Sequence, residues 1–296
     1  MKSRLLLLGV LLGLLAGPAC TRSGADRPAL SAADKTYPLK GEIMAVDARR
    51  DVLVVQHEAV AGLMPAMTME FAVSPGDAAN ARVGQHFRAD LLPSARGNYR
   101  LINLWPDGDA TAAEVRSGAV ALHRDTEARG QAVYREVGEN LPDFVLYDQS
   151  GRVVRSARFR GKQIMLNFIY TSCPVADMCP AATLKMMATQ RLAKAAGVPN
   201  LELVSITLDP ERDTPGVLHD YAAARGIDLG NFSFLTGPEA AIRDLLTQFG
   251  VIAVFDGPIA RHTLTTLLID EHGRIVDRAD GSVWEPRDFV AKMHRG

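Results

Sequence analysis

The chain has 296 residues, a formal net charge of −1 and 47 % hydrophobic residues. This length suffices for two domains, and the hydrophobic content supports packed cores rather than disorder. The 33 basic and 34 acidic residues balance each other, so the charge gives no electrostatic basis for binding nucleic acid.

The N-terminus has the pattern of an export signal. A short basic segment precedes the apolar stretch 5–16, which is too short to span a bilayer. Small residues then lead to Cys20, as in bacterial lipoproteins, whose cysteine is lipidated after cleavage. The alternative is an ordinary signal peptide, because Gly17 stands where lipoproteins usually have leucine. We expect a signal peptide (1–20), a tether (21–36), and a location in the periplasm or at the outer face of the cell membrane, held by a lipid anchor on Cys20.

Short apolar segments alternate with turn residues between 37 and 106. The expected strands are 41–46, 52–57, 67–73, 86–92 and 99–104. This pattern predicts a small all-β domain that closes as a five-stranded barrel. Residues 107–135 are rich in alanine and charge, which indicates a linker that includes a helix.

From 136 to 296, strands alternate with helices. The expected strands are 144–147, 152–155, 163–170, 201–208, 232–235, 264–269 and 274–278. The expected helices are 180–196, 214–225, 239–249 and 286–294. This alternation predicts an α/β domain with a central sheet covered by helices.

Two cysteines, Cys173 and Cys179, stand in the loop between the buried strand 163–170 and the helix 180–196. The pair can form a disulfide, remain a dithiol or bind a metal. The helix N-terminus favours a thiolate at Cys179, and thiolates are soft ligands that suit Cu(I).

A third ligand has to come from elsewhere, and His262 is the best candidate because the strand that follows it can bring it to the cysteine loop. The alternative is a structural histidine. Asp209 follows a strand and either lies behind the ligands or caps a turn before Pro210. Met178 is a soft neighbour of the loop, although methionines in such loops more often pack.

A second group of soft side chains lies in the β domain. Met67 and Met69 alternate in one strand and so share a face, Met64 precedes them, and His57 ends the preceding strand. Three thioethers and an imidazole suit Cu(I). The alternative is a methionine-rich core face.

Three segments, 160–180, 207–215 and 261–270, resemble the signatures of the Sco (SenC) family of copper metallochaperones, in the same order. The resemblance implies a thioredoxin-like fold over 136–296 and copper bound by Cys173, Cys179 and His262. It also implies a role in assembling the dinuclear CuA site of cytochrome c oxidase. The family has three residues between its cysteines and this chain has five, which leaves open whether delivery or thiol–disulfide exchange dominates.

The segment 37–106 resembles the periplasmic copper-binding domain of the CusF type, through His57 and the run from Met64 to Phe71. The resemblance implies an OB-like five-stranded barrel with His57, Met67 and Met69 as ligands. That family usually has a tryptophan where this chain has Met64.

Together these observations predict a copper metallochaperone with one copper, Cu(I) or Cu(II), at each site. It would receive copper from a periplasmic donor and deliver it to cytochrome c oxidase subunit II or another copper enzyme. The alternative is an enzyme, an extracytoplasmic thiol–disulfide reductase that uses Cys173 and Cys179 as its redox pair. A peroxidase is a weaker hypothesis, because no arginine that would activate Cys173 can be identified.

Overall fold

The computed structural model describes residues 35–93, 99–108, 110–130, 132–256 and 259–294. The expected signal peptide, the lipidation site Cys20 and nearly all of the expected tether lie outside these residues. Among the residues described, no helix is long and apolar enough to cross a membrane.

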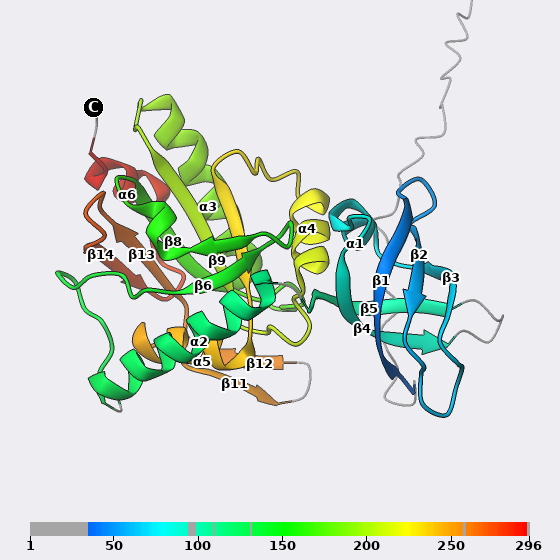
Figure 1. Cartoon of the computed structure of the whole chain (residues 1–296). Coiled ribbons are helices and arrows are strands. Elements are labelled where there is room, and N and C mark those ends of the chain that lie inside the picture. Colours follow the sequence, from blue (N-terminus) through cyan, green and yellow to red (C-terminus); the bar gives the residue numbers. More distant parts are fainter. Residues whose placement is uncertain (1–34, 94–98, 109, 131, 257–258, 295–296) are drawn as a thin grey trace, which may run out of the picture. The chain divides into compact units, whose positions relative to one another are not determined.

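The N-terminal domain is a closed five-stranded β-barrel, as the sequence predicts (Figure 1). Its strands, in the spatial order β1-β2-β3-β5-β4, are β1 Tyr37–Asp47, β2 Val52–His57, β3 Met67–Ala72, β4 His86–Pro93 and β5 Tyr99–Pro106. Inward-facing residues such as Ile43, Phe71 and Leu101 form a core of their own. A six-residue helix, α1 (Pro75–Asn80), occupies a segment that the sequence predicts as a turn, and Ser74 caps its N-terminus.

The expected linker contains a long helix, α2 (Ala110–Arg129). It packs against the later helix α5 (Glu239–Gln248). His123 Nδ1 lies 3.1 Å from a carboxylate oxygen of Asp244 at this contact. The helix is therefore held by specific contacts rather than being an independent spacer.

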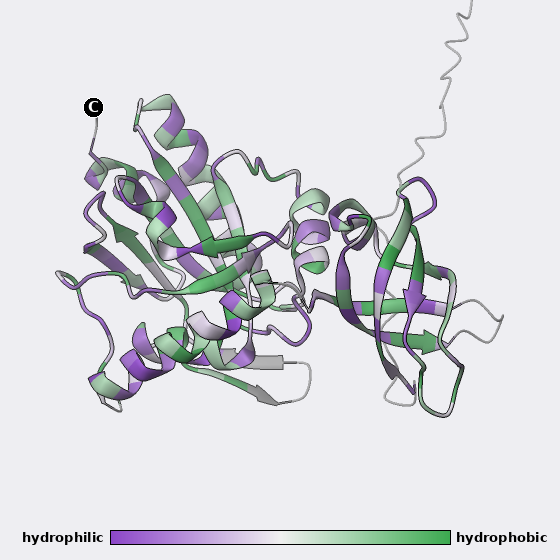
Figure 2. Cartoon of the chain, in the orientation of Figure 1, coloured by the Kyte–Doolittle hydropathy of each residue, from purple (hydrophilic) through white to green (hydrophobic). Residues whose placement is uncertain are grey.

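The C-terminal domain is built on a seven-stranded sheet with the order β14-β13-β8-β9-β10-β6-β7. Its strands are β6 Val145–Asp148, β7 Val153–Arg155, β8 Gln163–Ile169, β9 Leu201–Thr207, β10 Phe232–Thr236, β13 Thr265–Ile269 and β14 Ile275–Asp280. Strands β8, β9 and β10 are parallel and the outer pairs are antiparallel. Every residue of β8 and β9 is buried, which explains why most of their residues are apolar; Figure 2 shows these strands mostly in green.

Helices cover this sheet. They are α3 Cys179–Ala195, α4 Pro215–Ala224, α5 Glu239–Gln248 and α6 Pro286–Lys292. Helix α3 contacts β8, β9 and α6, and Thr183 on α3 hydrogen-bonds Tyr221 on α4 at 2.9 Å. The rings of Phe168 and Phe249 pack 5.6 Å apart and join β8 to the end of α5. Parallel strands with helices at their ends place the loops after β8 and β9 at one edge of the sheet.

A separate two-stranded hairpin, β11 (Ala253–Asp256) and β12 (Ile259–His262), precedes β13. The sequence analysis did not predict it. His262 is therefore the last residue of one strand rather than a residue leading directly into β13, and the hairpin determines where its backbone lies.

Candidate metal centre

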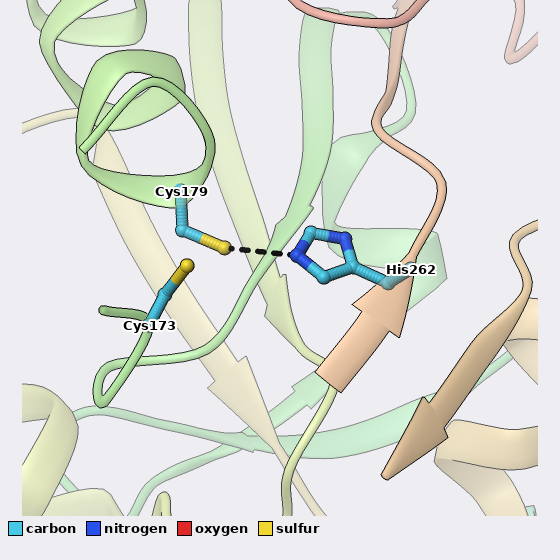
Figure 3. Close-up of side chains that lie close together, drawn as sticks. All are labelled: Cys173, Cys179 and His262. Atoms are coloured by element: carbon cyan, nitrogen blue, oxygen red, sulfur yellow. Dashed lines mark hydrogen bonds between the residues drawn. The ribbon is translucent and has the colours of Figure 1, made fainter. Parts of the chain in front are cut away.

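The structure brings Cys173, Cys179 and His262 together (Figure 3). One ligand atom from each lies within 4.8 Å of the others, and Cys179 Sγ is 3.5 Å from His262 Nε2. Metal–sulfur bonds of about 2.3 Å put two ligands of a three-coordinate ion about 4 Å apart. The three atoms therefore already have nearly the spacing that one metal ion requires.

The two cysteines reach the site from opposite ends of the loop. Strand β8 ends at Ile169, and a turn follows in which the Cys173 N–H donates to the carbonyl oxygen of Tyr170 at 3.4 Å. At the other end, Cys179 is the first residue of α3, with Pro180 behind it, a position that suits proline because no N–H is needed there. Cys179 is fully buried, whereas Cys173 is partly exposed.

His262 presents its Nε2 atom to the sulfurs. Its Nδ1 atom lies 3.1 Å from the carbonyl oxygen of Thr263, and a carbonyl can only accept, so Nδ1 carries the proton and Nε2 keeps its lone pair. The ring of Tyr170 meets the imidazole edge to face at 5.5 Å. Burial lowers the pKa of His262, so at neutral pH the imidazole is neutral and able to bind a metal.

The protonation of Cys179 differs from the sequence-based expectation. The helix N-terminus favours a thiolate, but burial raises the pKa of the Cys179 thiol, and the nearby Cys173 and Asp213 raise it further. A backbone hydrogen bond with Tyr170 lowers this pKa, but by less than burial raises it. Without a metal the buried sulfur therefore keeps its proton, and a binding metal ion has to displace it.

Asp209 closes the turn after β9, one of its two expected roles: its carbonyl accepts from the Arg212 N–H. Its carboxylate pairs with the Arg212 guanidinium at 2.9 Å. The acidic residue that contacts the cysteine loop is Asp213, four positions later. Asp213 accepts hydrogen bonds from the backbone and side chain of Thr171 and from the side chain of Thr207. The sequence analysis missed Asp213, although it stands in the same signature segment.

Asp213 is completely buried, and burial raises its pKa to about 6 against the effect of its threonine hydrogen bonds. At pH 7 the group is therefore mostly an anion. Met178 is half-buried at the end of the loop, directly before Cys179.

The second group of soft side chains gathers at one end of the barrel. In the β2–β3 ladder His57 lies opposite Met67, and Val55 lies opposite Met69. Because side chains alternate along a strand and opposite residues share a face, His57, Met67 and Met69 lie on the same face. Met64 precedes them in a turn closed by a bridge to Val60.

The imidazole of His57 has one ring nitrogen with a hydrogen-bond partner and one without. Its Nδ1 atom lies 2.6 Å from the carbonyl oxygen of Glu58, so this nitrogen carries the proton. Its Nε2 atom is buried and has no hydrogen-bond partner. A buried polar atom without a partner is costly, and a soft metal ion beside the methionine sulfurs would satisfy it. Met69 and Met64 are partly buried against the core, whereas Met67 is 46 % exposed.

Both domains of the chain match known protein families. The family model described as SCO1/SenC matches residues 134–295, and the model described as copper binding periplasmic protein CusF matches residues 36–106. The SCO2-like protein of Rickettsia typhi is 29 % identical over 174 residues, which are 56 % of this chain and 77 % of the relative. The SCO2-like protein of Rickettsia conorii is 32 % identical over 157 residues, which are 50 % of this chain and 74 % of the relative.

Among solved structures, a SCO1/SenC family lipoprotein from Bacillus anthracis superposes with a TM-score of 0.50. It is 24 % identical in sequence and covers 55 % of this chain and 97 % of its own. This likeness confirms the thioredoxin-like fold of the C-terminal domain. The SCO1/SenC match spans more than half of the sequence and contains the two cysteines and the histidine. The chain therefore belongs to the SCO1/SenC family, with a CusF-type barrel at its N-terminal end.

Proposed function

We propose that the protein is a copper metallochaperone that binds one copper ion through Cys173, Cys179 and His262. The observation that carries this proposal is the convergence of two sulfurs and one imidazole nitrogen within 4.8 Å. Two thiolates and an imidazole form a soft donor set that suits copper. A partly exposed Cys173 gives a partner protein access to the bound ion.

The barrel forms the second copper site of this proposal, through His57, Met67 and Met69, with Met64 beside them. Thioethers carry no proton and do not form disulfides, so this site can hold Cu(I) in an oxidising compartment. The unpartnered Nε2 atom of His57 supports it. One copper at each site would let the barrel receive the ion from a periplasmic donor before the cysteine site passes it on.

The recipient we propose is cytochrome c oxidase subunit II, at its CuA site, or another copper enzyme outside the cytoplasm. Membership of the SCO1/SenC family supports this role, and the signal-like N-terminus supports export. We further propose that Cys20 carries a lipid anchor that keeps the protein at the membrane surface, where an oxidase subunit would be within reach.

An anaerobic Cu(I) titration of the reduced full chain, in competition with a chromophoric chelator, tests both sites. We expect two equivalents for the unchanged protein, and one equivalent each for Cys173→Ser and Met67→Ala. Met44→Ala is the matched control, because Met44 is 43 % exposed on the same barrel and lies outside the cluster. If neither Cys173→Ser nor Met67→Ala loses an equivalent, the proposal is wrong.

The two free, adjacent cysteines also support a second function, reduction of a partner's disulfide. In that reaction the two thiols would become a disulfide while the partner gained two electrons and two protons, and a further reductant would have to restore the thiols. His262→Ala separates the functions. A chaperone loses copper from the cysteine site, whereas a reductase keeps its rate of thiol–disulfide exchange.

A further inference from the structure

The carboxylate of Asp213 joins the ends of two neighbouring strands beneath the cysteine loop. Its Oδ2 atom accepts from the Thr171 N–H at 3.0 Å and from Thr207 Oγ1 at 2.7 Å, and its Oδ1 atom accepts from Thr171 Oγ1. Thr171 is the second residue after β8, and Thr207 is the last residue of β9. Ile169 and Thr207 are partners in the parallel ladder, so the carboxylate fixes the exit from β8 to the adjacent strand.

Thr171 lies inside the turn that places Cys173. The turn runs from Tyr170 to Cys173 and is closed by a single long backbone hydrogen bond of 3.4 Å, which by itself holds its geometry weakly. Asp213 accepts two hydrogen bonds from Thr171, and together they fix both the position and the orientation of this turn. Carboxylate acceptors form stronger hydrogen bonds than neutral acceptors.

Within the described residues, the hydrogen bonds of the Asp213 side chain are those with Thr171 and Thr207. No ion pair among the described residues includes it; the neighbouring Arg212 pairs with Asp209 instead. The side chain is fully buried, and a buried carboxylate without a cation is expensive unless hydrogen bonds compensate it. These hydrogen bonds come from the second residue after β8, where the cysteine loop begins, and from the end of β9.

We propose that Asp213 is a positioning residue of the copper site, which holds Cys173 at the distance from Cys179 and His262 that one copper ion requires. This inference rests on the proposed function of the cysteine site. Partners that orient a metal ligand without touching the metal change metal affinity by about tenfold to hundredfold when removed. The five-residue spacing between the cysteines makes such an anchor more important, because a longer loop has more conformations to restrict.

Two substitutions separate hydrogen-bond geometry from charge. Asp213→Ala removes all three hydrogen bonds. Asp213→Asn keeps the shape: the amide oxygen can accept from the Thr171 N–H and Thr207 Oγ1, and the amide nitrogen can donate to Thr171 Oγ1, whose hydroxyl rotates. Thr171→Val removes only the hydrogen bond from the Thr171 hydroxyl. It replaces Asp213→Ala in the test if Asp213→Ala does not fold. Thr189→Val is the matched control, because Thr189 is a fully buried threonine of α3 that bonds the Lys185 carbonyl within its own helix.

The measurement is a Cu(II) titration of the full chain, with Cys20→Ser in every sample, followed through the thiolate-to-copper charge-transfer absorption. Methionine and histidine ligands do not produce this band, so the barrel site does not contribute. We expect the affinity to fall about tenfold or more, with a shifted band, in Asp213→Ala. A smaller fall is expected in Thr171→Val, and near-normal behaviour in Asp213→Asn and Thr189→Val.

An unchanged affinity and band in folded Asp213→Ala, or in Thr171→Val if Asp213→Ala is unfolded, would overturn the inference. Equal losses in Asp213→Asn and Asp213→Ala would also overturn it, because geometry would then not be what matters. Failure of the proposed function gives a different result. The unchanged protein would then show no charge-transfer band, or a band that remains in Cys173→Ser.

Discussion

The imidazole of His262 meets the ring of Tyr170 edge to face, with centroids 5.5 Å apart and planes at 83°. Tyr170 is almost fully buried at the end of the central strand β8, whereas His262 ends the short hairpin strand β12. This contact therefore joins the histidine on the hairpin to the strand from which the cysteine loop departs.

The contact predicts a role for an aromatic ring at position 170. An edge-to-face pair contributes about 0.5–1.5 kcal/mol beyond its buried area, which corresponds to about three- to tenfold in affinity. Tyr170→Leu should weaken copper binding at the cysteine site by about this factor, and Tyr170→Phe, which keeps the ring, should weaken it less. Cu(I) competition titrations measure both. Equal affinities of the two variants would contradict the prediction.

The barrel site predicts a specific loss from His57. Replacing His57 by leucine removes the unpartnered Nε2 atom while keeping the position apolar, so the barrel should stay folded and lose its Cu(I) or Ag(I) equivalent. The control is His86→Gln, because His86 is an exposed histidine of β4 in the same barrel. Isothermal titration with Ag(I) should give one fewer equivalent for the first variant only. Two equivalents in His57→Leu would contradict the assignment.

The position of Gly41, beside the barrel site, leaves no room for a larger side chain. It lies opposite His57 in the β1–β2 ladder, and a Cβ atom there would come within 2.7 Å of the Gln56 carbonyl oxygen and 3.0 Å of the His57 Cα. These are backbone atoms, so Gly41→Ala should lower the free energy of unfolding of the barrel by about 1–3 kcal/mol and disturb its metal site. Thermal unfolding checks this.

Gly230→Ala is the matched control. Its Cβ would approach only the Asp228 side chain, at 3.1 Å, and that exposed side chain can move. If Gly41→Ala unfolds at the same temperature as Gly230→Ala and the unchanged protein, the steric argument is refuted.

His123 predicts a pH-dependent contact between α2 and α5. Hydrogen bonding to Asp244 is the main cause that raises the pKa of His123, and the charges of Asp244 and Glu127 add to it. A raised folded-state pKa stabilises the fold fully below the unfolded value of about 6.5, and this stabilisation is lost as the pH rises through the folded value. The stability difference between the unchanged protein and His123→Gln should therefore be larger at pH 5.5 than at pH 8.

Urea unfolding at these two pH values measures that difference. His272→Gln serves as control, because the His272 ring is 3.9 Å from its nearest carboxylates and such distant pairs contribute little. A difference for His123→Gln that grows with pH would reverse the sign and contradict the prediction.

Much of the fold could be predicted from the sequence because buried segments show a clear pattern of apolar residues. Strand β8 is buried along its whole length, which favours a mainly apolar sequence. Gly197 marks the end of α3 with a positive φ of 70°. The six residues of α1 are too few to show a helical period. The strands of the β11–β12 hairpin have only four residues each, which is also too short for a clear pattern.

The site could be predicted only in part. The cysteine pair is evident because both residues stand at the carboxyl end of a buried strand. Asp209 and Asp213 occupy the same signature segment, and no local pattern shows which carboxylate turns toward the loop. Arg212 pairs with the carboxylate of Asp209. Thr171, 42 positions before Asp213, donates hydrogen bonds to the carboxylate of Asp213. That choice is made by tertiary contacts, which a single sequence does not record.

The two sulfurs of the C-terminal site differ in access, because Cys179 is fully buried and Cys173 is partly exposed. An incoming protein can touch only the outer sulfur, so exchange of copper or of a disulfide, as proposed, would have a fixed order. The partner would first bond with Cys173, and Cys179 would react second. Brief alkylation of the native, metal-free protein should accordingly label Cys173 before Cys179, and mass spectrometry of the resulting peptides would reveal that order.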